Sequence, residues 1–253
     1  MSALAIGQGL NSAAARPMLM STGEQTQWLL AFFSQVARDG LEGRFSPFVH
    51  SCIFQQRFSA SSCHAVTAQA CGTAQARLQL LQRLEDIHEL TTQTLSRLLL
   101  DKASNKKDAE VESLIVRLFS DTQSLWTSAP KELNNDFGFW ESWVVAESIR
   151  RSMFAAIMVR GLWHAAAHGH VYYEPFFESM PFDPRTDIWE AKSSEEWEEA
   201  IRKTGGQHTQ LKSYHEFITT TGTKLNPEED GVFQRLLFVC YHGSRGIRAL
   251  EEP

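Results

Sequence analysis

Apolar residues recur at helical spacing along most of this 253-residue chain, and alternating strand patterns are nearly absent. The longest such segment runs from Arg77 to Leu100, where the apolar positions include Leu78, Leu81, Ile87, Leu95 and Leu98. An apolar residue at every third or fourth position forms one stripe along an α-helix. Glu110 to Trp126 repeats the pattern, and Lys102 to Lys107 is predicted to be a loop. The sequence therefore predicts an all-α fold, a single irregular multi-helix bundle.

Helix start signals agree with this periodicity at three places. The pattern Ser-x-x-Glu, typical of a capping box, occurs at residues 21–24, ahead of a segment that ends at Gly40, and again at residues 193–196. Residues 226–229 read Asn-Pro-Glu-Glu, which places a capping Asn before Pro at the first helical position and acids near the helix dipole. Each pattern predicts a helix that begins there.

Composition and length favour one domain. With 43% hydrophobic residues, the chain can bury one large core, and no linker or fixed-period repeat divides it. We expect a mobile tail at residues 1–20 without the features of a secretory signal, and a single helical domain at residues 21–253. The apolar stretch from Ser152 to Tyr173 contains Arg160, three histidines and two glycines, which favours a buried helix over a membrane span. Unclustered cysteines suit the cytoplasm, or the nucleus for a regulator.

The charge balance argues against direct contact with nucleic acid. The chain has 24 Lys and Arg against 30 Asp and Glu, a formal net charge of -6, whereas phosphate binding needs a basic face. Arg150 and Arg151 form a local basic cluster, and Glu147 lies four residues before Arg151, a spacing that favours an ion pair on one helix face. We therefore expect a salt-bridged helix surface there rather than a phosphate site.

The region from residue 137 to 197 contains an ordered series of motifs. These are W-x-x-W at 140–143, E-S-x-R-R at 147–151, an apolar helix, M-P-F at 180–182, I-W-E-A at 188–191 and a final Trp197. This order resembles the regulatory domain of fungal zinc-cluster transcription factors, and Pro47 to His50 resembles the front of the same domain. The resemblance covers about residues 45 to 245. It implies a helical domain that senses small effectors and contacts protein partners.

The zinc cluster of that family is missing from the sequence. The family uses six closely spaced cysteines to hold two zinc ions, whereas this chain has only Cys52, Cys63, Cys71 and Cys240. We expect these cysteines to pack as small hydrophobes, with no metal ion or other cofactor. The resemblance extends to freestanding proteins of fungal secondary-metabolite clusters, which lack the zinc cluster and are thought to help release or cyclise polyketide chains.

Candidate catalytic residues lie in the sequence WHAAAHGHVYYE. His164 and His168 are four residues apart and share one helix face, with His170 just beyond the expected helix end. Imidazole titrates near neutrality, and Glu174 is a neighbouring carboxylate able to set its tautomer, so these four residues are predicted to transfer protons. Two alternatives stay open: a metal ion held by the histidine pair, or histidines with no chemical role.

Apolar residues near this segment are candidates for lining a substrate cavity. They are Phe154, Met158, Trp163, Tyr172 and Tyr173. Helical bundles build cavities from facing helices, although such residues also serve as plain core. The chain lacks a G-x-S-x-G elbow, a P-loop and G-x-G-x-x-G.

Three functions fit these observations. The first is an enzyme that assists release, hydrolysis or cyclisation to a lactone or pyrone of a free or acyl-carrier-bound polyketide chain. The second is a transcriptional regulator or co-regulator that senses a small molecule and acts through partners, and the third is a carrier or sensor without turnover. The extra histidines favour the enzyme. A homodimer or a contact with a polyketide synthase is compatible with the first reading.

Overall fold

The structure is a computed structural model that describes residues 23–44, 46–54, 68–101, 109–132, 139–168, 176–222, 225 and 230–251. These residues form ten α-helices, a π-helical turn, a short 3-10 helix and a two-stranded sheet. The all-α prediction is confirmed. The predicted N-terminal tail lies outside the described residues.

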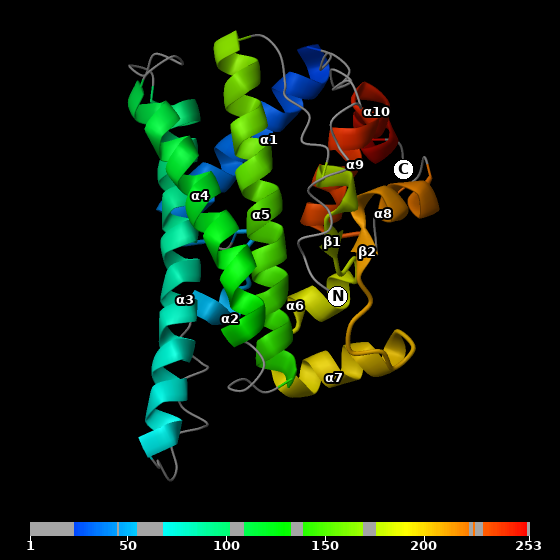
Figure 1. The fold of residues 1–253 in the computed structure, drawn as a ribbon. Coiled ribbons are helices and arrows are strands. Elements are labelled where there is room, and N and C mark those ends of the chain that lie inside the picture. Colours follow the sequence, from blue (N-terminus) through cyan, green and yellow to red (C-terminus); the bar gives the residue numbers. More distant parts are fainter. Residues whose placement is uncertain are drawn as a thin grey trace, which may run out of the picture.

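Three long helices stand side by side and form one layer (Figure 1). They are α3 (Ala68–Leu95), α4 (Ala109–Glu132) and α5 (Phe139–His168). α1 (Gly23–Leu41) crosses α3 and the π-helical turn at Ser96–Leu100 that follows it. The helices predicted around residues 77–100 and 110–126 are confirmed, and both are longer than predicted.

α5 is buried on nearly every side. From Trp143 to Val159, only Ala146 and Arg150 keep partial exposure. A helix that is apolar all round must lie inside a protein, and the apolar stretch that begins at Ser152 meets this rule. The predicted helix is confirmed as far as His168 and is fully buried from Ser152 to Val159, and the rest of the predicted stretch lies outside the described residues.

Shorter elements pack beside α5 and form the second part of the bundle (Figure 1). The helices there are α6 (Thr186–Glu190), α7 (Ser194–Lys203), α8 (Tyr214–Thr221), α9 (Val232–His242) and α10 (Ser244–Glu251). A 3-10 helix at Phe177–Ser179 precedes β1 (Pro181–Phe182), which pairs antiparallel with β2 (Lys212–Ser213). The M-P-F motif thus contributes the short strand β1. α2 (Ser51–Phe54) lies between α1 and α3 in the chain.

Capping explains several helix ends. The Ser193 hydroxyl accepts a hydrogen bond from the Glu196 backbone N–H at 3.2 Å, which confirms the start predicted at residues 193–196. α9 ends at Gly243, whose φ of 58° is a conformation that favours glycine. The patterns predicted at residues 21–24 and 226–229 fall wholly or partly outside the described residues.

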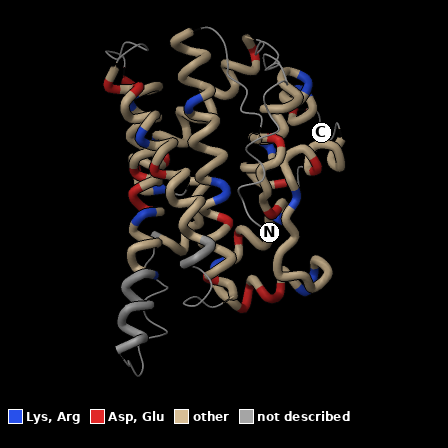
Figure 2. Tube along the Cα trace, viewed as in Figure 1, with Lys and Arg blue, Asp and Glu red and all other residues tan. Residues whose placement is uncertain are grey.

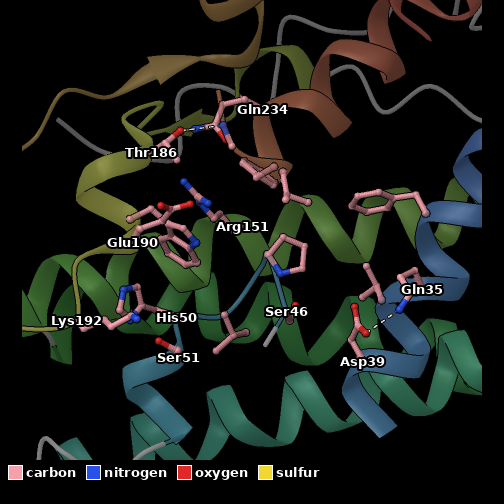
Figure 3. Close-up of a pocket in the computed structure, with 18 of the residues that line it drawn as sticks. Gln35, Asp39, Ser46, His50, Ser51, Arg151, Thr186, Glu190, Lys192 and Gln234 are labelled. Carbon is pink, nitrogen blue, oxygen red and sulfur yellow. Dashed lines mark hydrogen bonds between the residues drawn. The ribbon is translucent and has the colours of Figure 1, made fainter. Parts of the chain in front are cut away.

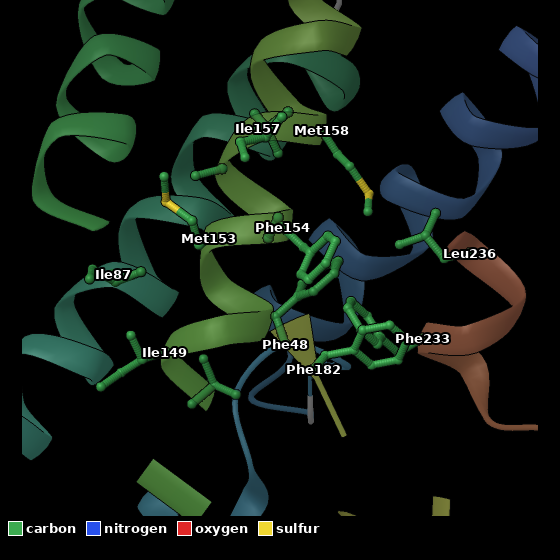
Figure 4. Close-up of a cluster of buried hydrophobic side chains, with 14 of the residues drawn as sticks. Phe48, Ile87, Ile149, Met153, Phe154, Ile157, Met158, Phe182, Phe233 and Leu236 are labelled. Atoms are coloured by element: carbon green, nitrogen blue, oxygen red, sulfur yellow. The ribbon is translucent and has the colours of Figure 1, made fainter. Parts of the chain in front are cut away.

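An aromatic cluster joins the two parts of the bundle. The ring of Phe154 on α5 lies 5.3 Å from Phe177, 5.8 Å from Phe182 and 5.5 Å from Phe233, each in an edge-to-face arrangement. Phe48 meets Phe233 at 6.1 Å. Figure 4 shows these rings converging from α5, β1, α9 and the segment before α2. Edge-to-face aromatic pairs add to the stabilisation from buried area, so this cluster holds the short elements against α5.

Gly40, in the last turn of α1, allows that helix to approach α3 closely. A Cβ built at Gly40 would lie 2.4 Å from Oγ1 and 2.8 Å from Cγ2 of the buried Thr92. Alanine normally stabilises a helix by about 1 kcal/mol relative to glycine. At Gly40 the clash of the added methyl group with Thr92 outweighs this stabilisation. We expect Gly40→Ala to lower the free energy of unfolding by about 1–3 kcal/mol in urea titrations.

Gly23→Ala is the matched control, because nothing lies within 4 Å of a Cβ at the start of α1. Adding Thr92→Ala should restore part of the stability lost by Gly40→Ala. The close approach would be refuted by a Gly40→Ala protein as stable as the parent.

Candidate ligand-binding cleft

A charged network lies inside the bundle along one face of α5. Glu147 is fully buried, and its carboxylate accepts hydrogen bonds from Nε of Arg150 at 2.9 Å and from Nε of Arg151 at 3.0 Å. The backbone N–H of Asp183 donates to both carboxylate oxygens at 3.2 Å. The Glu147–Arg151 ion pair is confirmed, but its predicted place on the helix surface is wrong, because the elements after α5 cover this face.

Asp183 extends the network beyond α5. Its buried carboxylate accepts from Nε and Nη2 of Arg185 at 2.8 and 2.6 Å. Nε1 of Trp143 and the backbone N–H of Gln210 donate to it as well, each at 3.3 Å. Arg185 in turn donates to the carbonyl oxygen of Gln207 at 2.7 Å. Asp183 thereby ties α5 to the segment that follows α7.

The network has more positive than negative groups. Three guanidinium groups, those of Arg150, Arg151 and Arg185, meet the two carboxylates of Glu147 and Asp183. Buried charges cost several kcal/mol each unless they are paired and hydrogen-bonded. Burial lowers the pKa of the Arg151 guanidinium, and the charge and hydrogen bond of Glu147 oppose that effect. The five side chains together carry one excess positive charge.

The Arg151 guanidinium lies against two aromatic rings. Its central carbon lies 3.8 Å from the ring centroid of Trp189 and 4.6 Å from that of Phe233. Stacking on aromatic faces suits the planar guanidinium and keeps its edge available for hydrogen bonds. Nη2 uses that edge to donate to the carbonyl oxygen of Asp183 at 3.4 Å. Position and plane of this cation are therefore both fixed.

A cleft of about 850 Å³ opens beside Arg151 (Figure 3). It lies between α1, residues 46–51, α6 and the start of α9. Its apolar lining consists of Phe32, Val36, Pro47, Val49, Trp189, Val232 and Phe233. Polar side chains also line it, among them Gln35, Asp39, Glu190, Lys192 and Gln234. Apolar walls with a small number of polar groups are typical of a site for small molecules.

His50 lines the same cleft in a structural role. Its Nδ1 accepts a hydrogen bond from the Cys52 backbone N–H at 3.2 Å, and its own backbone N–H donates to Oγ of Ser148 at 3.1 Å. The ring meets Trp189 edge-on at 5.0 Å. Burial lowers the pKa of His50 to about 4, against the effect of a backbone hydrogen bond with Trp189. The imidazole is thus neutral at pH 7, and the backbone hydrogen bond to Ser148 attaches this segment to α5.

The predicted catalytic pair lies at the C-terminal end of α5. The ring centroids of His164 and His168 are 5.5 Å apart, and that of Trp163 is 4.6 Å from His164 and 5.4 Å from His168. These three residues are not among those that line the cleft. Thirteen residues separate Arg151 from His164, which is roughly 20 Å along a helix. His170 and Glu174, the other predicted catalytic residues, lie outside the described part of the chain.

The predicted substrate-binding residues also lie either away from the cleft or outside the described part of the chain. Phe154 is fully buried within the aromatic cluster, and Met158 lies between α5 and α9 near Leu236 (Figure 4). Neither lines the cleft. Tyr172 and Tyr173 fall outside the described residues. A binding role for these side chains stays a prediction.

Neither Arg151 nor Trp189 is predicted as a site residue from the sequence, although a signal for Arg151 is present. Glu147 and Arg151 lie within a run that is apolar around the whole helix, and a charged pair in such a run must be buried. Trp189 had no comparable signal. The cleft joins residues 32–39, 46–51, 186–196 and 231–234, which become neighbours only in the folded chain.

The described residues were also searched for metal sites and membrane-spanning helices. No group of three or more His, Cys, Asp or Glu residues that could hold a metal ion occurs there. None of the helices in the described part is long and apolar enough to cross a membrane. Figure 2 shows Lys and Arg interspersed with Asp and Glu along the trace, and α7 begins with acidic residues and ends with basic ones.

Comparison of the chain with family models, curated proteins and solved structures found no match. The resemblance to fungal regulatory domains stays a prediction. The function is therefore inferred from the cleft and the charged network.

The buried network predicts that removing the charge of Glu147 strongly lowers the stability of the protein. Glu147→Gln keeps the shape of the side chain but leaves Arg150 and Arg151 without their carboxylate. Removing one partner of a buried ion pair costs about 3–5 kcal/mol, and we expect that loss in the free energy of unfolding measured in urea. Glu110→Gln, which breaks the exposed pair with Arg97, is the control and should change little. Equal effects of the two substitutions would contradict the network.

Proposed function

We propose that this chain is a small-molecule effector domain that binds its ligand in the cleft beside Arg151 and acts through a protein partner rather than through DNA. The cleft is the observation that carries the proposal. It combines apolar walls with a fixed, buried cation, and ligand sites in proteins have this character. The motif order that resembles fungal regulatory domains is consistent with it.

Hydrogen bonds at the rim of the cleft connect the helices that a bound ligand would contact. Nε2 of Gln234 on α9 donates to the carbonyl oxygen of Pro184 at 2.7 Å, and the Gly231 N–H donates to Oγ1 of Thr186 at 2.9 Å. These bonds join α6 to α9 on one side, while α1 supplies the facing side through Phe32. A ligand that touches both sides stabilises one arrangement of these helices over others. A partner that contacts the helices would respond to that arrangement.

Acid–base chemistry in the cleft has weaker support than binding. The ring of His50 is neutral at pH 7 and its Nδ1 accepts from a backbone N–H. Oδ1 of Asp39 accepts hydrogen bonds from Arg44 and Gln35, and, against the opposing effect of burial, Arg44 lowers the pKa of this carboxyl group. A carboxylate with a lowered pKa is a weak general base.

A second candidate function is acid–base assisted release or cyclisation of a polyketide chain at the end of α5. The adjacent rings of His164 and His168, beside Trp163, favour it. Neighbouring imidazoles are able to relay a proton between a substrate and solvent, and exposed His168 is accessible to a chain delivered on a carrier protein. His170 and Glu174 are the other residues proposed to take part.

Filling the mouth of the cleft tests the first candidate. Val232 lines the cleft and is 55% exposed, so Val232→Trp should block the cleft without disturbing the core. The probes are a panel of apolar acids, amides, alcohols and lactones, screened by thermal shift and titrated by calorimetry. We expect compounds that bind the parent to lose about 10-fold or more in affinity, roughly 1.4 kcal/mol, on Val232→Trp.

Val116→Trp on α4 is the matched control, because Val116 is 62% exposed and does not line the cleft. It should bind like the parent. His168→Gln decides between the two candidates in the same assay. Binding or turnover that is lost in His168→Gln and kept in Val232→Trp would replace the cleft with the histidine site.

A further inference from the structure

Arg151 presents one edge of its guanidinium to the cleft. Nε donates to Glu147 and Nη2 to the carbonyl oxygen of Asp183. The hydrogen bonds of Arg151 within the described part of the chain use Nε and Nη2 and leave Nη1, and Arg151 lines the cleft although only 1% of its surface is exposed. An acceptor on a ligand would form a charge-assisted hydrogen bond with Nη1.

The charge of the surrounding network favours an anionic acceptor. Glu147 is shared between Arg150 and Arg151, and Asp183 is engaged by Arg185. One excess positive charge thus remains in a largely buried cluster. A single negative charge on the ligand would balance it, and charge-assisted hydrogen bonds are about twice as strong as neutral ones.

The neighbours of the guanidinium limit the direction from which an anion binds. Trp189 and Phe233 lie against the group, Nε donates to Glu147 and Nη2 to Asp183, which leaves Nη1 for the ligand. A carboxylate oxygen is a strong acceptor for such a cationic N–H donor. Because the plane is already fixed, little side-chain entropy is lost on binding.

The rest of the cleft limits the anion to one charge on an apolar body. Glu190 and Glu196 line the cleft with exposed carboxylates, with Lys192 between them in the chain. These carboxylates repel a phosphate or other multiply charged group. Phe32 and Val49 line the cleft as apolar wall and suit an aromatic or aliphatic body.

We infer that the cleft selects monocarboxylic acids with an apolar body, and that Arg151 is the group that binds the carboxylate. The inference rests on the proposed ligand-binding function and adds the chemical class of the ligand. Lys192 also lines the cleft, but its side chain is exposed, and an ion pair in solvent contributes little binding energy.

Matched pairs of ligands test this on the unmodified protein. Phenylpropanoic acid and its primary amide have the same shape and differ in charge, as do octanoic acid and octanamide. Calorimetric titration at pH 7 should show each acid binding about 10-fold or more tightly than its amide. Phenylpropyl phosphate should bind more weakly than the acid.

Substitutions at Lys192 and Arg151 test which of the two side chains causes the preference for the acid over the amide. Lys192→Met should keep the preference for the acid. Arg151→Lys keeps the charge but removes the fork of donors, and should lower the acid-to-amide ratio several-fold. Because Arg151→Lys risks misfolding, the acid-to-amide ratio of the parent and of Lys192→Met decides the inference without it.

The outcomes separate this inference from the proposed function. Equal affinity for acid and amide, with both lost in Val232→Trp, would overturn the role of Arg151 and leave the cleft as the ligand site. Loss of the preference in Lys192→Met would also overturn it. If neither acids nor amides bind the parent, the proposed function and this inference fail together.

Discussion

Burial of the Glu147 carboxylate is the constraint on which the rest of the structure depends. A buried carboxylate needs donors for its oxygens, and Glu147 obtains them from Arg150, Arg151 and the backbone of Asp183. Two of these donors lie on α5 itself, but the third requires the segment after α5 to return to it. The hydrogen bond to Asp183 thus fixes the position of β1, and through β1 that of β2.

The same network places the cation of the proposed ligand site. Arg151 pairs with Glu147, lies against the rings of Trp189 and Phe233, and also lines the cleft. Arg151 therefore has two roles: it stabilises the buried Glu147, and it supplies the cation of the proposed ligand site. The cation is organised before a ligand arrives, which lowers the cost of binding.

The sequence predicted the fold class and several helix ends because these depend on local patterns. Periodicity located α3 and α4, Ser193 located the start of α7, and the spacing of Glu147 and Arg151 gave their ion pair. The exposure of that pair was predicted wrongly, since elements far along the chain decide which face of α5 is covered. The two-residue strands had no local signal, because only their pairing defines them.

The candidate site was less predictable than the fold. Spacing along a helix correctly predicted that His164 and His168 would be neighbours. It did not reveal the cleft, whose lining comes from four separate segments and from Arg151 on α5. Phe154 was chosen for its apolar character, which core and cavity residues share, and it lies in the aromatic cluster. His170 and Glu174 lie outside the described residues, so their proposed role stays a prediction.

Solvent exchange of the Arg151 Nε–H, followed by side-chain nitrogen NMR, tests the central claim most directly. This proton is buried and hydrogen-bonded to Glu147 at 3.0 Å, whereas the side chain of Arg117 on α4 is 68% exposed. Protection against exchange reports on burial and hydrogen bonding in the native state, and we expect the Arg151 proton to exchange on the order of 100-fold more slowly than that of Arg117. Equal exchange rates for the two protons would contradict a buried network centred on Glu147.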